Sequence, residues 1–413
     1  MSAPIEICIP GSNPGHGNRH VRWDLATLHG IDTDLDPWFR KFGNPGIAAV
    51  TLGRIGVAVF LADRAVPRNK LRQRRDIALV VPVPDMALAI QAQASAQRLL
   101  GFVTGDNWLI EFSSDTSSPE SGETLPQVSE VALLSGGLDS FCGALIKGTT
   151  DRMFLSHSDA SVIRWSQNQS AHLVLGANFA RHVSVRVAAK YPFQKEASRR
   201  SRSILFVALA VALADAVGAT FVEIPENGFT SLNPPLAHNR GGVLTTRSTH
   251  PMTFHLFADV LADLGLGVAL RNPYEWHTKG ELVKEAVEKV GAQTVADGAS
   301  HTMSCAKSNL ILKGKTFGRN CGLDYACIVR RAGIKAAGIT DPTAYECHTP
   351  ALAQDVAEAR KQDVAAVRQA LGTIPSGELL LARCGPFPPG YDYPRAVQLW
   401  QRGLDELRAI NLP

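Results

Sequence analysis

An apolar stretch that runs into Ser-Gly-Gly-Leu-Asp-Ser, at residues 135–140, constrains this chain more than any other feature. The stretch from Val131 to Leu134 predicts a buried strand, and a helix is expected to begin near Asp139. Two adjacent glycines let the backbone turn sharply and approach a ligand without interference from a Cβ atom. Backbone N–H groups at a helix start bind anions, helped by the helix dipole. The pattern therefore predicts a phosphate-binding loop in which Asp139 can also hold Mg²⁺.

Strands and helices alternate after this loop. Apolar runs predict strands at 153–156, 182–187 and 219–224, and helices at 203–217 and 281–290. Such alternation predicts an α/β fold in which helices cover both faces of a parallel sheet. Ligands of such sheets bind beyond the carboxyl ends of the strands.

The segment 113–127, which reads SSDTSSPESGETLPQ, predicts a linker because it lacks apolar periodicity. It divides an N-terminal α+β domain, residues 1–112, from the rest. In that domain we expect strands at 46–52, 55–61, 77–83 and about 108–112, with a helix at 86–100. After the linker we expect the catalytic domain at 128–300, a metal-binding segment at 301–348, and a helical extension at 349–413 with helices at 355–371 and 395–410.

Composition narrows the class of protein. With 413 residues, 45% hydrophobic and 19% charged, the chain suits a soluble protein of two or three domains. A net charge of +4 does not demand a nucleic-acid partner.

The basic run from Arg64 to Arg75 is interpreted as a solvated loop, with a phosphate or RNA contact as the alternative. Without a membrane span or a secretory signal, and with seven cysteines, the expected location is the cytoplasm.

Three cysteines and one aspartate form the second motif. Cys321, Asp324 and Cys327 are spaced three apart, so they converge from one turn and the following helix. Together with Cys305 they make a plausible tetrahedral Zn²⁺ site. His301 competes with Asp324 for the fourth position, and Cys347 or His348 is a more distant candidate. The alternative is that the cysteines are simply buried thiols.

The loop lacks the Gly-Lys-Ser/Thr ending of a Walker A motif and instead resembles that of the PP-loop ATP pyrophosphatases. The resemblance implies the adenine nucleotide alpha hydrolase (HUP-like) fold and cleavage of ATP between its α and β phosphates. It also implies that the loop holds ATP through Ser135, Gly136, Gly137, Leu138, Asp139 and Ser140.

Within these enzymes the chain is most similar to the QueC family, the 7-cyano-7-deazaguanine synthases. The similarity covers about 128–335 and rests on the loop, on Arg202-Ser203 before an apolar helix, on Thr278-Lys279-Gly280-Glu281, and on Thr302-Met303-Ser304-Cys305 with the downstream cysteines. Asp324 stands where the family has a third cysteine, and Pro-Glu-Asn-Gly-Phe-Thr-Ser-Leu-Asn-Pro-Pro at 225–235 replaces a family segment. These departures make the chain resemble the QueC-like (QatC-like) proteins of bacterial anti-phage defence operons.

The resemblance implies adenylation of the carboxylate of a 7-carboxy-7-deazaguanine-like base, followed by capture with ammonia or with an amine on a partner protein. Asp139, Ser140, Lys279 and Arg202 are the expected catalytic residues. His157 is a further candidate for binding the nucleotide, and Glu226, Asn227 and Phe229 are candidates for binding the base.

Two other functions stay open from the sequence. One is a PP-loop enzyme that modifies tRNA or another acid, and the other is a catalytically silent ATP-binding scaffold in a defence complex. The expected ligands are ATP, Mg²⁺, Zn²⁺ and a deazapurine-like small molecule. A protein acceptor or operon partner and a homodimer are left open, and a membrane partner is not expected.

Overall fold

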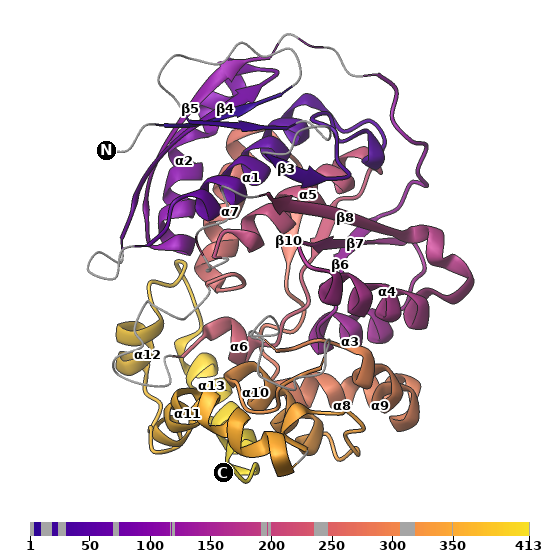
Figure 1. Cartoon of the computed structure of the whole chain (residues 1–413), viewed down its shortest axis with the longest axis vertical. Helices are drawn as coiled ribbons and strands as arrows, with labels where there is room; N and C mark the ends of the chain where they lie inside the picture. The colour runs from indigo at the N-terminus through magenta and orange to yellow at the C-terminus, as the bar shows by residue number, and fades with distance from the viewer. Residues whose placement is uncertain are drawn as a thin grey trace.

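The computed structural model describes residues 4–9, 19–23, 30–68, 74–115, 117, 120–190, 196, 200–234, 247–305, 319–348 and 350–412. Within them the strands form a sheet of six and a sheet of four (Figure 1). Helices α8 to α13 gather at the end of the molecule opposite the smaller sheet.

The larger sheet carries the phosphate-binding loop. Its strand order is β10 (Ala269–Arg271), β9 (Phe221–Glu223), β6 (Glu130–Leu133), β7 (Arg152–Ser158), β8 (His182–Ala189) and β3 (Ile31–Thr33). The first five strands run parallel, and β3 closes one edge antiparallel to β8. The predicted α/β fold with a parallel sheet is therefore confirmed.

The strand order reverses at β6. From β6 the chain moves outward through β7 and β8, and then returns to place β9 on the other side of β6. At such a reversal the loops that follow the two central strands diverge and leave a crevice at the carboxyl edge of the sheet. The loop after β6 and the segment after β9 must therefore lie next to each other.

Helices cover both faces of this sheet. On one face, α5 (Arg202–Ala216) packs against β6, β7 and β9, and its side chains from Ile204 to Ala214 are all buried. On the other face, α3 (Leu138–Lys147) and α4 (Ser161–Leu175) share an apolar cluster with β6 and β7 that includes Leu134 and Phe154. Because parallel strands are buried on both faces, they read as continuous apolar runs in the sequence.

The smaller sheet has the order β2 (Arg19–Arg22), β1 (Ile5–Cys8), β4 (Asp76–Val83) and β5 (Asn107–Ser114), and all its strands are parallel. Helix α2 (Met86–Thr104) packs on β5 and on α7 (Pro251–Asp263), and α1 (Ile47–Ala65) packs on both β4 and α5. One hydrophobic core therefore runs from the smaller sheet through α1 and α5 into the larger sheet.

The two strands expected at 46–52 and 55–61 are wrong, because these residues form the single helix α1. Seventeen of its 19 residues, from Ala49 to Ala65, are buried on every side, so the sequence shows no helical periodicity. Gly53 and Gly56, which resemble strand breaks, instead allow close packing. A Cβ on Gly56 would lie 2.7 Å from the Cβ of Ala208 on α5.

The interpretation of Arg64 to Arg75 as a solvated loop is wrong for Arg64, Arg68 and Arg75, whereas Arg74 is exposed and Lys70 and Arg72 lie outside the described residues. Arg75 forms ion pairs with Asp63 and Asp106, and Arg68 binds the same Asp106 at 2.6 Å. Arg64 is buried and donates to a backbone carbonyl. Arg68 and Arg75 are thus neutralised by aspartates inside the fold and are not offered to a nucleic acid.

The described chain after β10 is helical, which includes the extension at 349–413 that was expected to be so. It contains α8 (Lys279–Val290), α9 (Ala292–His301), α10 (Tyr325–Ala336), α11 (Pro350–Leu371), α12 (Gly377–Cys384) and α13 (Tyr393–Arg408). The two predicted extension helices correspond to α11 and α13, whereas α12 was not predicted. A second core, separate from that of the sheets, joins α10, α11, α12 and α13 around Trp400.

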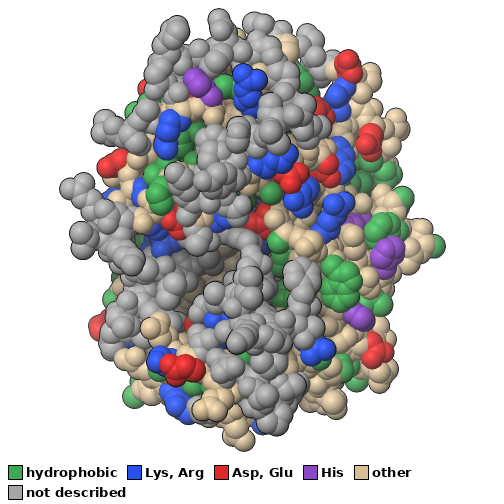
Figure 2. Space-filling view, viewed as in Figure 1, with side chains coloured by type: hydrophobic (Ala, Val, Ile, Leu, Met, Phe, Trp, Pro, Cys, Tyr) green, Lys and Arg blue, Asp and Glu red, His purple; other side chains and the backbone are tan. Residues whose placement is uncertain are grey.

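Charge on the drawn face is mixed, with Lys and Arg side chains interspersed with Asp and Glu (Figure 2). This agrees with the small net charge of the chain. Among the described helices, none combines the length and the apolar character that crossing a bilayer requires.

Candidate active site and metal centre

The phosphate-binding loop follows β6 directly. Gly136 has a φ of +82°, and a Cβ there would lie 3.0 Å from the side chain of Gln167. Both constraints demand glycine. The Gly136 carbonyl accepts hydrogen bonds from the Ser166 hydroxyl and the Met303 amide, each at 2.8 Å. The loop is therefore held from α4 and from the segment that leads to Cys305.

The two loop serines, Ser135 and Ser140, stabilise the turn through hydrogen bonds within the loop. The Ser135 amide donates to Ser140 Oγ at 3.1 Å, and the two hydroxyl oxygens are 3.0 Å apart. The Ser140 hydroxyl also reaches the Gly137 carbonyl at 3.1 Å. The Gly137 amide also donates to Ser135 Oγ, at 3.3 Å, so the two hydroxyls and the amides of Ser135 and Gly137 are engaged within the loop itself.

Helix α3 begins at Leu138, and no side chain caps its N-terminus at Gly137. The first amides of the helix are thus available to a phosphate. The Leu138 side chain is buried in the core against α8, so this residue can contribute only its backbone. Gly137 and Leu138, two of the predicted ATP-binding residues, accordingly have only main-chain atoms to offer a ligand here.

Asp139, in the first turn of α3, is the centre of a buried charged cluster. Lys279 Nζ lies 2.5 Å from its Oδ1, and Asn227 donates to its Oδ2 from both the backbone amide, at 3.1 Å, and Nδ2, at 2.7 Å. Burial alone would raise the pKa of Asp139, but the Lys279 ammonium and these hydrogen bonds hold that pKa below its ordinary value. The carboxylate is therefore charged.

Glu226 lies beside this pair, in the segment that follows β9. Burial, reinforced by the negative charge of Asp139, raises the pKa of Glu226 well above its ordinary value. Asn272, after β10, holds the Glu226 backbone in place by accepting from its amide at 3.3 Å and donating to its carbonyl at 2.8 Å. The two carboxyl groups at this site thus favour opposite protonation states.

The topology explains why these residues meet. Asp139 follows β6, Glu226 and Asn227 follow β9, and these two strands are neighbours at the reversal of strand order. Lys279 is the first residue of α8, whose start is fixed by a capping box between Thr278 and Glu281. The sequence predicted each residue, but only the structure joins them into one cluster.

Three other predicted site residues lie elsewhere. The His157 ring is fully buried, bonds the Val187 carbonyl at 3.1 Å, and packs edge-on against Phe60. Phe229 packs in the C-terminal core, where a Cβ on Gly403 of α13 would collide with its ring. Arg202 begins α5 and donates to the His157 carbonyl at 3.1 Å. The side chains of His157 and Phe229 therefore support the fold, and neither belongs to the Asp139 cluster.

Cys305, Cys321, Asp324 and Cys327 form a second, separate cluster. All four are buried, and their ligand atoms lie within 4.8 Å of one another. Cys305 Sγ is 3.2 Å from Asp324 Oδ2, and the sulfurs of Cys321 and Cys327 are 4.0 Å apart. A tetrahedral zinc site separates its ligand atoms by roughly 3.5–3.8 Å, given Zn–S of about 2.3 Å and Zn–O of about 2.0 Å. The cluster therefore fits a metal such as zinc.

Of the candidates for the fourth ligand, Asp324 joins the three cysteines among the described residues. His301 instead places its ring against Trp165. Hydrogen bonds with the thiols of Cys305 and Cys327 lower the pKa of Cys321, which favours the thiolate that binds metals. The side chain of His348 lies outside the described residues.

Three supporting residues around this cluster had no signature in the sequence. Asn320 Oδ1 accepts the Cys305 amide at 3.0 Å. Arg330, fully buried on α10, donates to Thr302 at 2.6 Å and to other groups of the same segment. Arg360 on α11 hydrogen-bonds Cys321. Arg360 thus opposes the negative charge of the cluster, whereas Arg330 fixes the segment that carries Cys305.

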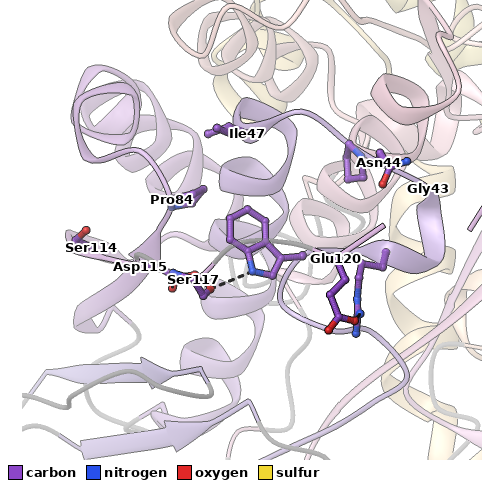
Figure 3. Close-up of a pocket in the computed structure, with 11 residues that line it drawn as sticks. Gly43, Asn44, Ile47, Pro84, Ser114, Asp115, Ser117 and Glu120 are labelled. Atoms are coloured by element: carbon purple, nitrogen blue, oxygen red, sulfur yellow. Dashed lines mark hydrogen bonds and ion pairs between the residues drawn. The ribbon is translucent and has the colours of Figure 1, made fainter. Parts of the chain in front are cut away.

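Two surface pockets lie away from the loop. One, about 400 Å³, is formed by the start of α1, the end of β5 and the segment that follows it, and Figure 3 shows Ile47, Pro84 and Ser117 around it. The other, about 740 Å³, lies beyond β10 between α6 (Gly228–Leu232), α7 and residues 388–392. Asn272 lines the second pocket and also braces Glu226, so this pocket adjoins the charged cluster.

The three relatives found by comparison with known proteins carry the same name. The chain is similar to proteins named 7-cyano-7-deazaguanine synthase. The one from Myxococcus xanthus is 26% identical over 242 residues, which are 52% of this chain and 96% of the relative. The one from Ectopseudomonas mendocina is 28% identical over 148 residues, 35% of this chain and 57% of the relative. A protein of that name from Sinorhizobium fredii is 46% identical, but over 55 residues, 13% of this chain and 22% of the relative.

No family model matches the chain, and no solved structure gives a significant match. The distant homologues support a QueC-like family and an enzyme of the PP-loop ATP pyrophosphatase type. The parallel sheet with flanking helices is consistent with the PP-loop fold of such homologues.

Proposed function

We propose that this protein uses ATP to adenylate the carboxylate of a 7-carboxy-7-deazaguanine-like base and then transfers the acyl group to an amine. The observation that carries the proposal is the meeting of the phosphate-binding loop with Asp139, Lys279, Glu226 and Asn227 at the reversal of strand order. The names of the distant homologues supply the substrate class.

In the first step, adenylation, each residue of the site has a separate role. The uncapped amides of α3 and the Lys279 ammonium bind the β and γ phosphates, which leave as pyrophosphate. A substrate carboxylate oxygen attacks the α phosphorus, the bond from that phosphorus to the bridging oxygen breaks, and an acyl-adenylate results. Asp139 and Glu226 are oxygen donors suited to Mg²⁺, which neutralises phosphate charge when it is bound. Holding both reactants in line is the main contribution of the protein.

The second step replaces AMP with an amine. The amine nitrogen attacks the acyl carbon, AMP leaves, and a proton passes from nitrogen to a nearby base. Ammonia or an amine on a partner protein is the acceptor in this proposal. Support for a protein acceptor comes from the altered 225–234 segment and from large regions outside the 128–335 similarity, which offer docking surface. We further propose that the enzyme works in the cytoplasm as part of anti-phage defence.

The metal cluster has a structural role in this proposal, since four protein ligands leave no open position for water. It fixes the segment from Thr302 to Cys305, and Met303 of that segment binds the loop carbonyl of Gly136. A metal there therefore acts on the active site through the loop.

The alternative of tRNA thiolation receives no support from the described residues. Cys142, the cysteine nearest the loop in sequence, has no exposed surface, and burial raises the pKa of its thiol to about 12. Such a group does not supply a thiolate at neutral pH.

The test uses purified protein, Mg²⁺, α-labelled ATP and 7-carboxy-7-deazaguanine. We expect AMP and pyrophosphate to appear only with the base, and to fall at least about 100-fold in Asp139→Asn, whose shape is conserved. ADP as the product would overturn the pyrophosphatase mechanism. AMP release that ignores the base would overturn the substrate, and rapid nitrile formation from ammonia alone would overturn the partner-protein acceptor.

A further inference from the structure

The carboxylate of Glu406, on the C-terminal helix α13, binds the first turn of α8. Both of its oxygens accept the Gly280 amide, at 3.0 and 3.1 Å, and one also accepts the Thr278 hydroxyl. A carboxylate at a helix N-terminus satisfies free amides and opposes the positive end of the helix dipole. This contact therefore joins a helix from the end of the fold to the turn that carries Lys279.

A second bond from α13 reinforces the contact. Arg402, one turn before Glu406, donates to Glu281 at 2.7 Å and to the Trp276 carbonyl at 2.8 Å. Glu281 in turn accepts the Thr278 amide in the capping box. Helix α13 thus holds polar groups on both sides of Lys279 at the start of α8.

The position of Lys279 is also restricted from the opposite side. A Cβ on Gly333 of α10 would lie 2.7 Å from Lys279 Cγ and 2.9 Å from its Cβ. Glycine at 333 therefore lets the lysine stem pass close to the α10 backbone on its way to Asp139. A Cβ on Gly280 would collide with the Glu406 carboxylate and with Ala336. Only a small range of α8 positions keeps Lys279 Nζ at 2.5 Å from Asp139.

We propose that Glu406 is a positioning residue of the ATP site. It sets the first turn of α8 so that the Lys279 ammonium faces both Asp139 and the departing pyrophosphate. The inference rests on the proposed function, because it assigns Lys279 to the phosphates. Glu406 lies outside residues 128–335, the segment on which the sequence resemblance rests.

The test is a double-mutant cycle on Mg²⁺-ATP binding, measured by calorimetry with the full-length protein. In Glu406→Gln one acceptor oxygen becomes an NH₂ group that faces the Gly280 amide, donor against donor. We expect Glu406→Gln to weaken ATP binding about tenfold in the wild-type background, within the range seen for contacting residues. In the Lys279→Met background we expect the same substitution to change binding less than about twofold, since no ammonium remains to be misplaced.

Asp405→Asn is the matched control. Asp405 is the neighbouring carboxylate on α13, is exposed, and bonds Gln401 and Arg408 of its own helix. We expect the ATP affinity of this variant to stay within about twofold of wild type. Thermal unfolding is recorded for every variant, so that loss of fold is separated from loss of affinity.

The outcomes are distinct. Equal losses from Glu406→Gln in both backgrounds, or no loss in wild type, would overturn the positioning role. No effect of Lys279→Met on ATP binding would overturn the proposed function of Lys279 itself. If Glu406→Gln does not fold, Gly333→Ala perturbs the same lysine from the other side. Gly333→Ala should then weaken ATP binding in the wild-type background but not in the Lys279→Met background. An equal loss of affinity in both backgrounds would overturn the inference.

Discussion

At the scale of single residues, the site depends on two neighbouring carboxyl groups with opposite preferences. Asp139 is held charged by Lys279 and Asn227, while Glu226, facing that charge, favours its protonated form. Environments that push two carboxyl pKa values apart are typical of acid–base pairs. Because the two groups are in contact, they titrate as a unit rather than independently.

The contribution of Glu226 to the free energy of unfolding should fall as the pH rises. Its pKa is higher in the folded protein than in the unfolded chain, so the folded state binds more protons above about pH 4.5. Its stabilising contribution is complete below that pH and is lost as the pH rises through the raised pKa. We expect the wild type to lose unfolding free energy relative to Glu226→Gln between about pH 5 and 7, by at most about 1.4 kcal/mol per pH unit.

Urea unfolding of both proteins at several pH values measures this difference. Glu288→Gln, at an exposed position of α8, controls for the loss of one negative charge. If the stability of the wild type relative to Glu226→Gln instead increases with pH, the sign of the prediction is wrong.

The predicted residues that the structure brings together belong to spaced motifs. The loop, Lys279 and the cysteine cluster were found because each has neighbours at fixed offsets. Asn272, Arg330 and Glu406 were missed because each acts alone through long-range contacts, and an isolated Asn, Arg or Glu in a sequence predicts only a polar position. The sequence did not show that the His157 ring packs in the core, because the end of a strand can face the core as well as the ligand crevice.

At the scale of elements, α1 shows why a buried helix is hard to recognise. A helix that is apolar on all sides has no amphipathic period, and short apolar runs with glycines read equally well as strands. Length was the better guide, because 19 continuous residues exceed an ordinary strand. Strands β6 to β9 of the larger sheet and the helices α5 and α8 were predicted because turn residues bound them clearly, whereas the three-residue strands β3 and β10 were not predicted.

Gly56 should be essential to the packing of α1 on α5. Alanine normally stabilises a helix by about 1 kcal/mol over glycine. At Gly56, however, the new Cβ meets Ala208 Cβ at 2.7 Å, so Gly56→Ala should cost about 1–3 kcal/mol through overpacking. Gly101 in α2 is the control, because a Cβ there would lie 3.6 Å from the Asp106 carbonyl oxygen, an ordinary contact, and Gly101→Ala should raise stability. Denaturant unfolding compares the two, and stabilisation by both would contradict the packing argument.

At the scale of the whole molecule, the boundary proposed at residues 112–113 crosses a shared hydrophobic core. Helix α1 lies against α5, and β3 pairs with β8, although both come from the N-terminal part. Composition predicted a linker at 113–127, although Ser113 and Ser114 are the last residues of β5, and composition contains no information about which surfaces such a segment joins. The fold class was predictable from alternation, whereas the joint core of the two sheets was not.

The N-terminal part should therefore not fold alone. A fragment of residues 1–127 would expose the face of α1 that α5 covers, so we expect it to aggregate or to lack a cooperative thermal transition. Co-expression with residues 128–413 should recover a soluble complex that co-purifies. Circular dichroism and size-exclusion chromatography test this. A soluble monomeric fragment with a cooperative transition would show that the N-terminal part is an autonomous domain.

The long separation in sequence between Asp139, Lys279 and Glu406 also matters during synthesis on the ribosome. Asp139 precedes Lys279 by 140 residues, and the first turn of α8 precedes Glu406 by 126 to 128. At about 5–20 residues per second, each interval takes roughly 6–28 s of translation. The nascent chain thus carries its nucleotide loop for many seconds before the groups that complete it are made. The proposed ATP site is consequently incomplete in the nascent chain until Glu406 has been synthesised.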